Sequence, residues 1–228
     1  MLRRAFIACS LIAGLAPAAL VSEAWAGPLE DGIAAYKKRD WEKAWKLLKP
    51  LADEGNAAAQ EHIGRLYERG KTVTADFREA LDWYVKAADQ GDALAQGHVG
   101  KIYRAGFFNG RADFGNALKY YRLAAAKGVA VAQLGLGSMY KAGEGVTESE
   151  AEAVAWFRKA ADQGDAAAQM NLASMYRYGK GVPKDIKEAQ QLLKLAAAGT
   201  DPEYDEDVFV RAKRELEQIA SALGTGTL

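Results

Sequence analysis

The chain has 228 residues, and its 30 Lys and Arg balance its 30 Asp and Glu, so the formal net charge at neutral pH is zero. Half of the residues are hydrophobic and only 5 are proline, a composition typical of folded proteins and not of disordered ones. Nucleic-acid-binding proteins usually carry a strong basic excess, so we expect no nucleic acid among the partners.

The first 26 residues have the pattern of a secretory signal peptide. Arg3 and Arg4 precede an apolar run from Ala5 to Val21, and Ala24-Trp25-Ala26 supplies a small-x-small cleavage site. The sequence therefore predicts that residues 1–26 are removed and that the mature chain is periplasmic or secreted, with no membrane span. An uncleaved membrane anchor is the alternative. The arginine pair also partly matches a twin-arginine signal, so the export route stays open.

An internal repeat organises the rest of the chain. The segment Ala-x-Ala-Gln occurs four times, with glutamines 36, 37 and 36 residues apart at Gln60, Gln96, Gln133 and Gln169. A tyrosine follows each glutamine by seven residues, and a glycine follows each tyrosine by three. Later in each unit an aromatic or apolar pair precedes a double alanine, as Trp83-Tyr84 precedes Ala87-Ala88. So many matching positions do not arise by chance, so these segments are copies of one repeat.

Each unit is predicted to be a pair of helices joined by a short turn. The first helix of the first unit should run from about Ala57 to Arg69, where apolar residues recur at helical spacing. The second helices should begin after side chains suited to N-caps, namely Asp76, Asp113, Ser149 and Asp185. In three units a glutamate stands at the third helical position and would complete a capping box: Glu79, Glu152 and Glu188. Glycines in the left-handed conformation should end the second helices: Gly91, Gly128, Gly164 and Gly199.

The two ends of the array differ from the four repeats of residues 57–200. Residues 27–56 predict a shorter, degenerate hairpin with Asp40 as a cap. Residues 201–228 predict a final helix and a tail, beginning at Asp201-Pro202. This helix carries one apolar stripe of Val208, Ala212, Leu216, Ile219 and Leu223. We expect it to cap the array by shielding the apolar face of the last repeat from water.

The unit resembles the Sel-one-like repeat, a relative of the tetratricopeptide repeat. Its clearest copies are residues Leu136 to Val146 and Leu172 to Val182. Departures from the pattern are Ala173 in a glycine place, Ser149 in an aspartate place and one extra residue between Gly106 and Asp113. The resemblance implies an all-α solenoid, a right-handed superhelix whose first helices line a concave face. It also implies an adaptor that binds another protein, as a regulator in envelope signalling or envelope assembly.

Enzymatic chemistry finds little support in the sequence. The only cysteine, Cys9, would leave with the signal peptide. His62 and His98 occupy the same place in adjacent units, which stack on the order of 10 Å apart, too far for one metal ion to join both rings. The glycines of residues 64–72 have the wrong spacing for a phosphate-binding loop. We expect no catalytic residues, no metal and no cofactor, and rank a cell-envelope hydrolase third among the functions.

Two functional classes remain: a protein-binding scaffold, and a carbohydrate or cell-wall binding module acting in polysaccharide or peptidoglycan assembly. Aromatic rings exposed on the concave face would favour the second, because sugars stack on them. The helical spacing of the Trp and Tyr residues in the second helices favours core packing instead. We therefore prefer protein binding.

The candidate binding surface is a stripe along the first helices, on the side away from the buried positions. Its polar residues are Glu61, Arg65, Glu68, Lys101, Arg104, Ser138, Lys141, Ser174 and Arg177. The last three units contribute four bases and no acid, so the stripe should be positive toward the C-terminal half and attract an acidic segment of a partner. Merely solvated charges are the alternative.

A second candidate contact is the loop with the extra residue. Phe107 and Phe108 stand there where the neighbouring loops carry a single valine. One ring can fill the valine socket, and the other would then be exposed at the loop tip as an anchor for a partner. The alternative is that both rings pack under the loop.

Overall fold

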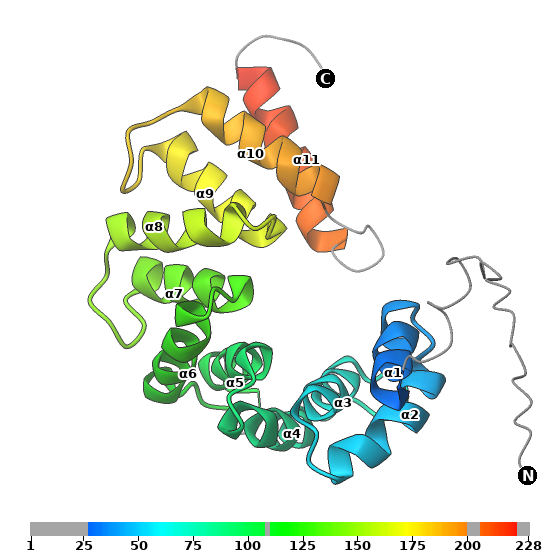
Figure 1. The fold of residues 1–228 in the computed structure, drawn as a ribbon. Helices are drawn as coiled ribbons and strands as arrows, with labels where there is room; N and C mark the ends of the chain where they lie inside the picture. Colours follow the sequence, from blue (N-terminus) through cyan, green and yellow to red (C-terminus); the bar gives the residue numbers. More distant parts are fainter. Residues whose placement is uncertain (1–26, 108–109, 200–205, 223–228) are drawn as a thin grey trace, which may run out of the picture.

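The computed structural model describes residues 27–107, 110–199 and 206–222. Within these ranges the chain forms eleven α-helices and no strand. The helices pack in consecutive pairs, and the pairs stack side by side into an open arc (Figure 1). Their bounds are α1 Pro28–Lys37, α2 Trp41–Asp53, α3 Ala57–Arg69, α4 Phe77–Asp89, α5 Ala93–Ala105, α6 Phe114–Ala126, α7 Ala130–Ala142, α8 Glu150–Ala161, α9 Ala166–Tyr178, α10 Ile186–Gly199 and α11 Glu206–Ala222. The predicted all-α solenoid is confirmed.

The turns inside the repeats are fixed by the predicted N-caps. The Asp76 carboxylate accepts hydrogen bonds from the backbone N–H groups of Arg78 and Glu79, and Asp113, Ser149 and Asp185 cap their helices in the same way. The other contact of the predicted capping boxes, from the N–H of the cap residue to the glutamate side chain, is wrong. The cap residue's own N–H donates to a tyrosine carbonyl near the end of the preceding helix, in the pairs Asp76–Tyr67, Asp113–Tyr103, Ser149–Tyr140 and Asp185–Tyr176. Those carbonyls lack intrahelical donors, so the turn satisfies both groups.

A tight contact between the two helices of a repeat explains a glycine in the first helix. A Cβ atom on Gly137 of α7 would lie 2.6 Å from ring carbons of Phe157 in α8, and the ring is fully buried. Gly64 meets Tyr84 and Gly100 meets Tyr121 in the same way. In the last repeat Ala173 replaces the glycine, and the smaller Leu193 replaces the ring in the same buried core. The departure at Ala173 is therefore matched by a smaller partner.

The repeated glutamine has a structural role. In three repeats its buried side-chain amide donates to a backbone carbonyl at the end of the preceding second helix. The pairs are Gln60 to Ala52 at 3.1 Å, Gln96 to Ala88 at 3.2 Å and Gln169 to Ala161 at 3.3 Å. Each of these carbonyls also accepts the backbone N–H of the glycine three residues later, so the glutamine is a second donor, and its bond fastens one repeat to the next.

The two ends of the array follow the prediction in most respects. Residues 27–56 form the pair α1 and α2, and the Asp40 carboxylate caps α2. Helix α11 buries Ala212 and Ile219 and packs Val208 and Leu216 against the core of the last repeat, so it caps the array. Gly199 was expected in the left-handed conformation, but it is the last residue of α10 and has no positive φ. The signal segment, Asp201-Pro202 and Leu223 lie outside the described residues.

Among the described helices, none combines the length and apolar character needed to cross a membrane.

Candidate functional site

The first helices α3, α5 and α7, which carry most of the predicted stripe, lie toward the inner side of the arc (Figure 1). Its first position is wrong. Glu61 has only 1% of its surface exposed, and Gly97 and Met170 at the same place in α5 and α9 are buried as well. These residues lie in the contact between successive first helices, which the helical period of a single helix does not reveal. A Cβ on Gly97, for example, would touch Val131 of α7.

The other stripe positions reach solvent, but their charges are largely paired. Lys101 lies 2.7 Å from Glu68, Arg104 lies 2.6 Å from Glu144, and Arg177 lies 3.8 Å from Glu215. Within the described residues Lys141 is exposed and has no ion pair. The expected unbroken positive stripe is therefore not present. Its prediction missed Glu144, which stands in a turn, and Glu215, which the capping helix supplies.

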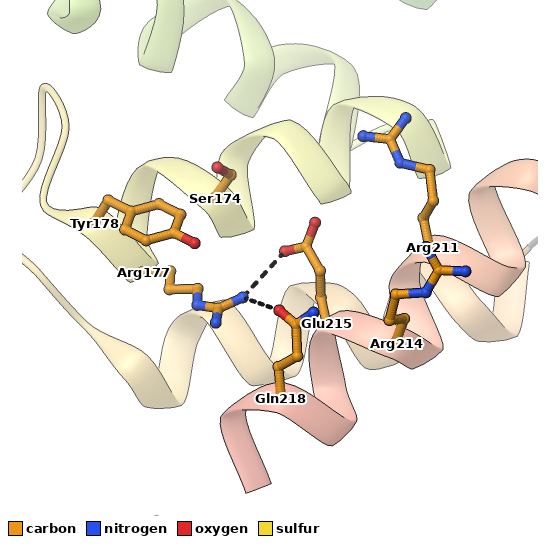
Figure 2. Close-up of a pocket in the computed structure, with 7 residues that line it drawn as sticks. All are labelled: Ser174, Arg177, Tyr178, Arg211, Arg214, Glu215 and Gln218. Atoms are coloured by element: carbon orange, nitrogen blue, oxygen red, sulfur yellow. Dashed lines mark hydrogen bonds and ion pairs between the residues drawn. The ribbon is translucent and has the colours of Figure 1, made fainter. Parts of the chain in front are cut away.

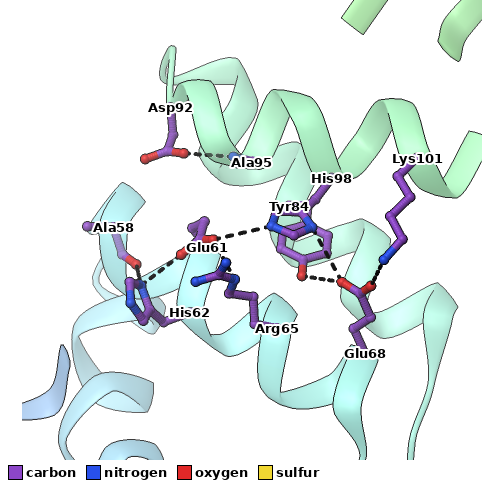
Figure 3. A network of polar contacts seen from close by, with 10 residues as sticks. All are labelled: Ala58, Glu61, His62, Arg65, Glu68, Tyr84, Asp92, Ala95, His98 and Lys101. Carbon is purple, nitrogen blue, oxygen red and sulfur yellow. Dashed lines mark hydrogen bonds and ion pairs between the residues drawn. The ribbon is translucent and has the colours of Figure 1, made fainter. Parts of the chain in front are cut away.

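A buried polar network joins the first two repeats (Figure 3). The Glu61 carboxylate lies between two imidazoles, 2.8 Å from Nδ1 of His62 and 3.7 Å from Nε2 of His98, and Nε of Arg65 lies 3.2 Å away. The His62 Nδ1–H donates to the carbonyl oxygen of Ala58, so neither Glu61 oxygen receives an aligned hydrogen bond within the described residues. Among those residues, no group of three or more His, Asp or Glu side chains is arranged to hold a metal ion.

Glu68 forms the second half of this network. It accepts hydrogen bonds from the Tyr84 hydroxyl at 2.7 Å and from Lys101 at 2.7 Å, while the His98 ring stacks on the Tyr84 ring (Figure 3). Burial raises the pKa of Glu68, but His98 and Lys101 outweigh it and hold the pKa well below the usual range. For Glu61, burial is likewise outweighed by His62, Arg65 and His98, so its pKa is lowered. Both carboxylates are thus charged at neutral pH, and the network ties α3 to α5.

One hollow combines the two predicted contact sites. Its volume is about 350 Å³, and Lys101, Arg104 and Phe107 line it together with Ala105, Tyr121 and Glu144. Phe107 is 49% exposed and stacks on Phe77 of the preceding repeat, with ring centres 4.5 Å apart. Phe108 lies outside the described residues, so the division of roles between the two rings stays a prediction. The hollow places an accessible ring beside two basic side chains.

A second hollow lies between α9 and α11 (Figure 2). Ser174, Arg177 and Tyr178 come from α9 and Arg211, Arg214, Glu215 and Gln218 from α11, around a volume of about 280 Å³. Arg177 bonds to Gln218 at 3.3 Å and pairs with Glu215. Arg211 and Arg214 are exposed, and within the described residues neither has an ion pair. Tyr178 is 60% exposed. This C-terminal hollow therefore presents two cations without ion pairs on one side and an open ring on the other, with the Arg177–Glu215 pair between them (Figure 2).

From the sequence, only Ser174 and Arg177 of the C-terminal hollow were predicted; Tyr178 was missed, and α11 was interpreted purely as a shield. The signal that could have found the rest is the spacing of Arg211 and Arg214, three residues apart on the polar side of an amphipathic helix. The remaining aromatic prediction agrees with the structure, since Tyr84, Tyr121 and Phe157 of the second helices are buried. Their rings form core and not a sugar-stacking strip.

The repeat pattern also matches known proteins. The sequence pattern of the Sel1 repeat matches residues 57–92, 93–129, 130–165 and 166–201, which is more than half of the chain. The chain belongs to the Sel1 repeat family. This confirms the resemblance seen in the sequence. Sel1 repeats generally form non-catalytic scaffolds for protein–protein interaction. No curated protein sequence matches the chain.

Solved structures of Sel1 repeat proteins are similar to this one. A Sel1 repeat protein from Oxalobacter formigenes is 32% identical, with a TM-score of 0.68 over 87% of this chain and 77% of that one. A protective antigen of uropathogenic Escherichia coli strains with an SLR fold is 28% identical, with a TM-score of 0.66 over 86% of this chain and 46% of the antigen. A Sel1 repeat protein from Klebsiella pneumoniae, 18% identical with a TM-score of 0.55 over 83% of this chain and 89% of that one, shares the fold.

Proposed function

We propose that this Sel1 repeat protein is an exported adaptor that binds a partner protein through an acidic segment laid along the inner face of the arc. The observation that carries the proposal is the C-terminal hollow, where Arg211 and Arg214 have no ion pair in the described residues and lie across the hollow from the exposed ring of Tyr178. Arginine forks suit carboxylates, and an accessible tyrosine is a common interface anchor.

The hollow at Phe107 extends the same chemistry to the middle of the arc. There Arg104 is already paired with Glu144, so a partner carboxylate would share or replace that contact. Such a rim contact contributes to steering and specificity more than to affinity. The C-terminal hollow is therefore expected to dominate binding, and the middle hollow to fix the direction of the segment.

The experiment compares three forms of residues 27–228, each immobilised and exposed to an envelope extract of the source cells. They are the unaltered protein, the pair Arg211→Ser and Arg214→Ser, and a control pair, Lys187→Ser and Lys213→Ser. The control removes the same charge from exposed positions outside the hollow. A partner held by the first and third forms and lost by the second supports the proposal. A partner held equally by all three, or by none, contradicts it.

Export is part of this proposal and has its own test. We propose cleavage after Ala26, because Ala24 and Ala26 are the small residues that signal peptidase accepts. N-terminal sequencing of the protein from the periplasm or medium should then begin at Gly27. An N-terminus at Met1 on protein from those fractions would contradict it.

A further inference from the structure

A third hollow lies at the opposite end of the arc, where the N-terminal hairpin meets the first repeat. Its volume is about 320 Å³. The lining comes from the end of α1 and the following turn (Tyr36, Lys37, Arg39), the start of α2 (Trp41) and one face of α3 (His62, Arg65, Arg69). The hairpin precedes the residues that match the Sel1 repeat, so half of this hollow is built by a part of the chain that the family pattern does not describe.

The charge of this N-terminal hollow is one-sided. Four of its seven lining residues are Lys or Arg, and none is acidic. The carboxylate of the buried Glu61 lies 3.2 Å from Nε of Arg65. That contact is an ion pair through Nε without an aligned hydrogen bond, and the terminal nitrogens of the guanidinium carry paired donors that match the two oxygens of a carboxylate. Glu61 thus fixes the orientation of Arg65 while the fork stays available to a ligand.

The aromatic part of the wall is held rigidly. The Tyr36 ring makes edge contacts with Trp41, 5.2 Å away, and with His62, 5.0 Å away, and the Arg65 guanidinium lies 5.7 Å from its centre. Tyr36 is only 8% exposed, and its hydroxyl has no hydrogen-bond partner within the described residues. A buried hydroxyl without a partner is unusual in proteins, and a bound polar group would satisfy it. Burial raises the pKa of Tyr36, so the group is available as a donor.

The turn after α1 carries a further sign of a binding role. Arg39 has a φ of 63°, and the other described residues with positive φ are all glycine. The turn itself needs only backbone groups: the N–H of Arg39 donates to Tyr36 and that of Asp40 donates to Ala35. Glycine would meet this conformation without strain. An arginine at this position therefore adds positive charge to the lining of the hollow at a cost in backbone strain.

We propose that the N-terminal hollow binds the free C-terminal carboxylate of a partner polypeptide, with an apolar or aromatic last side chain against Tyr36 and Trp41. Its volume is at the low end for ligand pockets and suits one or two residues of an extended chain. The basic wall excludes an amino terminus and selects an anion. The flat aromatic surface next to it distinguishes a peptide end from a bare inorganic anion. This site is separate from the C-terminal hollow of the proposed function, and the two proposals are tested independently.

The test uses the mature chain, residues 27–228, and a library of random heptapeptides displayed with free C-terminal carboxylates. Peptides ending in an apolar or aromatic residue should be enriched. Synthetic copies of the enriched peptides are then titrated by calorimetry, once as free acids and once as C-terminal amides. We expect the amide to bind at least tenfold more weakly than the acid. Equal binding of acid and amide, or no enrichment at all, would overturn the proposal.

Matched variants locate the site. Lys37→Ser and Arg69→Ser should each weaken binding of the free acid at least threefold, whereas Lys38→Ser should not, because Lys38 is exposed on the same turn but does not line the hollow. The pair Arg211→Ser and Arg214→Ser should leave this binding unchanged. Loss of binding in the Lys38 variant to the same degree as in the Lys37 variant would show general charge attraction and overturn the assignment. Competition by millimolar phosphate as strong as that by the free acid would overturn the peptide specificity.

Discussion

Gly137→Ala is the substitution that most directly examines how the two helices of a repeat fit together. The added Cβ would lie 2.6 Å from Cδ1 and Cε1 of Phe157, and the ring is fully buried, so either the ring or a helix has to move. Overpacking of this kind costs about 1–3 kcal/mol. Alanine gains about 1 kcal/mol over glycine in a helix. Because both helices are packed on their neighbours, we place the cost near the upper end and expect a net loss of about 2 kcal/mol.

The loss should be relieved by a smaller residue at the ring position. The last repeat already carries this combination, Ala173 with Leu193. Phe157→Leu alone removes buried carbon atoms and should cost about 1–2 kcal/mol. The double variant should then be more stable than the sum of the two single losses by about 1 kcal/mol or more, as expected for residues in contact.

Urea denaturation of the four proteins measures this cycle. Gly115→Ala is the control, because a Cβ there meets only an oxygen of Asp113, at 3.5 Å. It should be neutral or stabilising by up to about 1 kcal/mol. A shift of about 2 kcal/mol in a chain of this size corresponds to a fall in Tm of about 4–8 °C. Additive effects at positions 137 and 157, or a Gly137 variant as stable as the Gly115 variant, would refute the reasoning.

Three further predictions concern single side chains. Gln96→Ala removes the side-chain donor to the Ala88 carbonyl, which keeps the N–H of Gly91, and should lower the free energy of unfolding by about 0.5–1.5 kcal/mol in urea titrations; no change would show that the side-chain bond adds nothing to stability. The pKa of Glu68 is lower in the folded chain than in the unfolded one, so the unfolded state binds more protons and stability should fall as pH drops below about 4.3. Glu68→Gln should lower the free energy of unfolding at pH 7 by about 1.5–3 kcal/mol and make it depend less on pH in the acid range. An unchanged dependence on pH would contradict the role of Glu68. Arg39→Gly removes the positive-φ strain and should raise the free energy of unfolding by about 1 kcal/mol, while weakening peptide binding in the N-terminal hollow; a destabilised variant would show that the arginine side chain supports the fold.

The fold could be predicted from the sequence because its determinants are local and repeated. The caps at Asp76 and its counterparts act within one turn of the chain, and a pattern that recurs every 36 or 37 residues identifies them. The capping boxes failed because the N–H groups found better acceptors across the turn, in the tyrosine carbonyls. That choice depends on the path of the loop, which side-chain spacing does not encode.

The binding surface was harder to predict because it depends on contacts between units. A helical period places Glu61 on a face, but only the stacking of α5 on α3 shows that this face is buried against His98. The partners of Arg104 and Arg177 come from a turn and from the capping helix, 40 and 38 residues away in the sequence. The N-terminal hollow escaped notice because its residues come from three separate segments and match no motif.

Cross-linking from defined positions tests the central claim, that a partner binds the inner face of the arc. A photoreactive residue is placed at Tyr178 or Phe107. The control position is the exposed Arg122 of α6, a second helix that lies toward the outer side of the arc (Figure 1). Illumination in intact cells should join one and the same partner to positions 178 and 107 and not to position 122. A partner captured mainly at position 122, with none at the other two, would contradict the account.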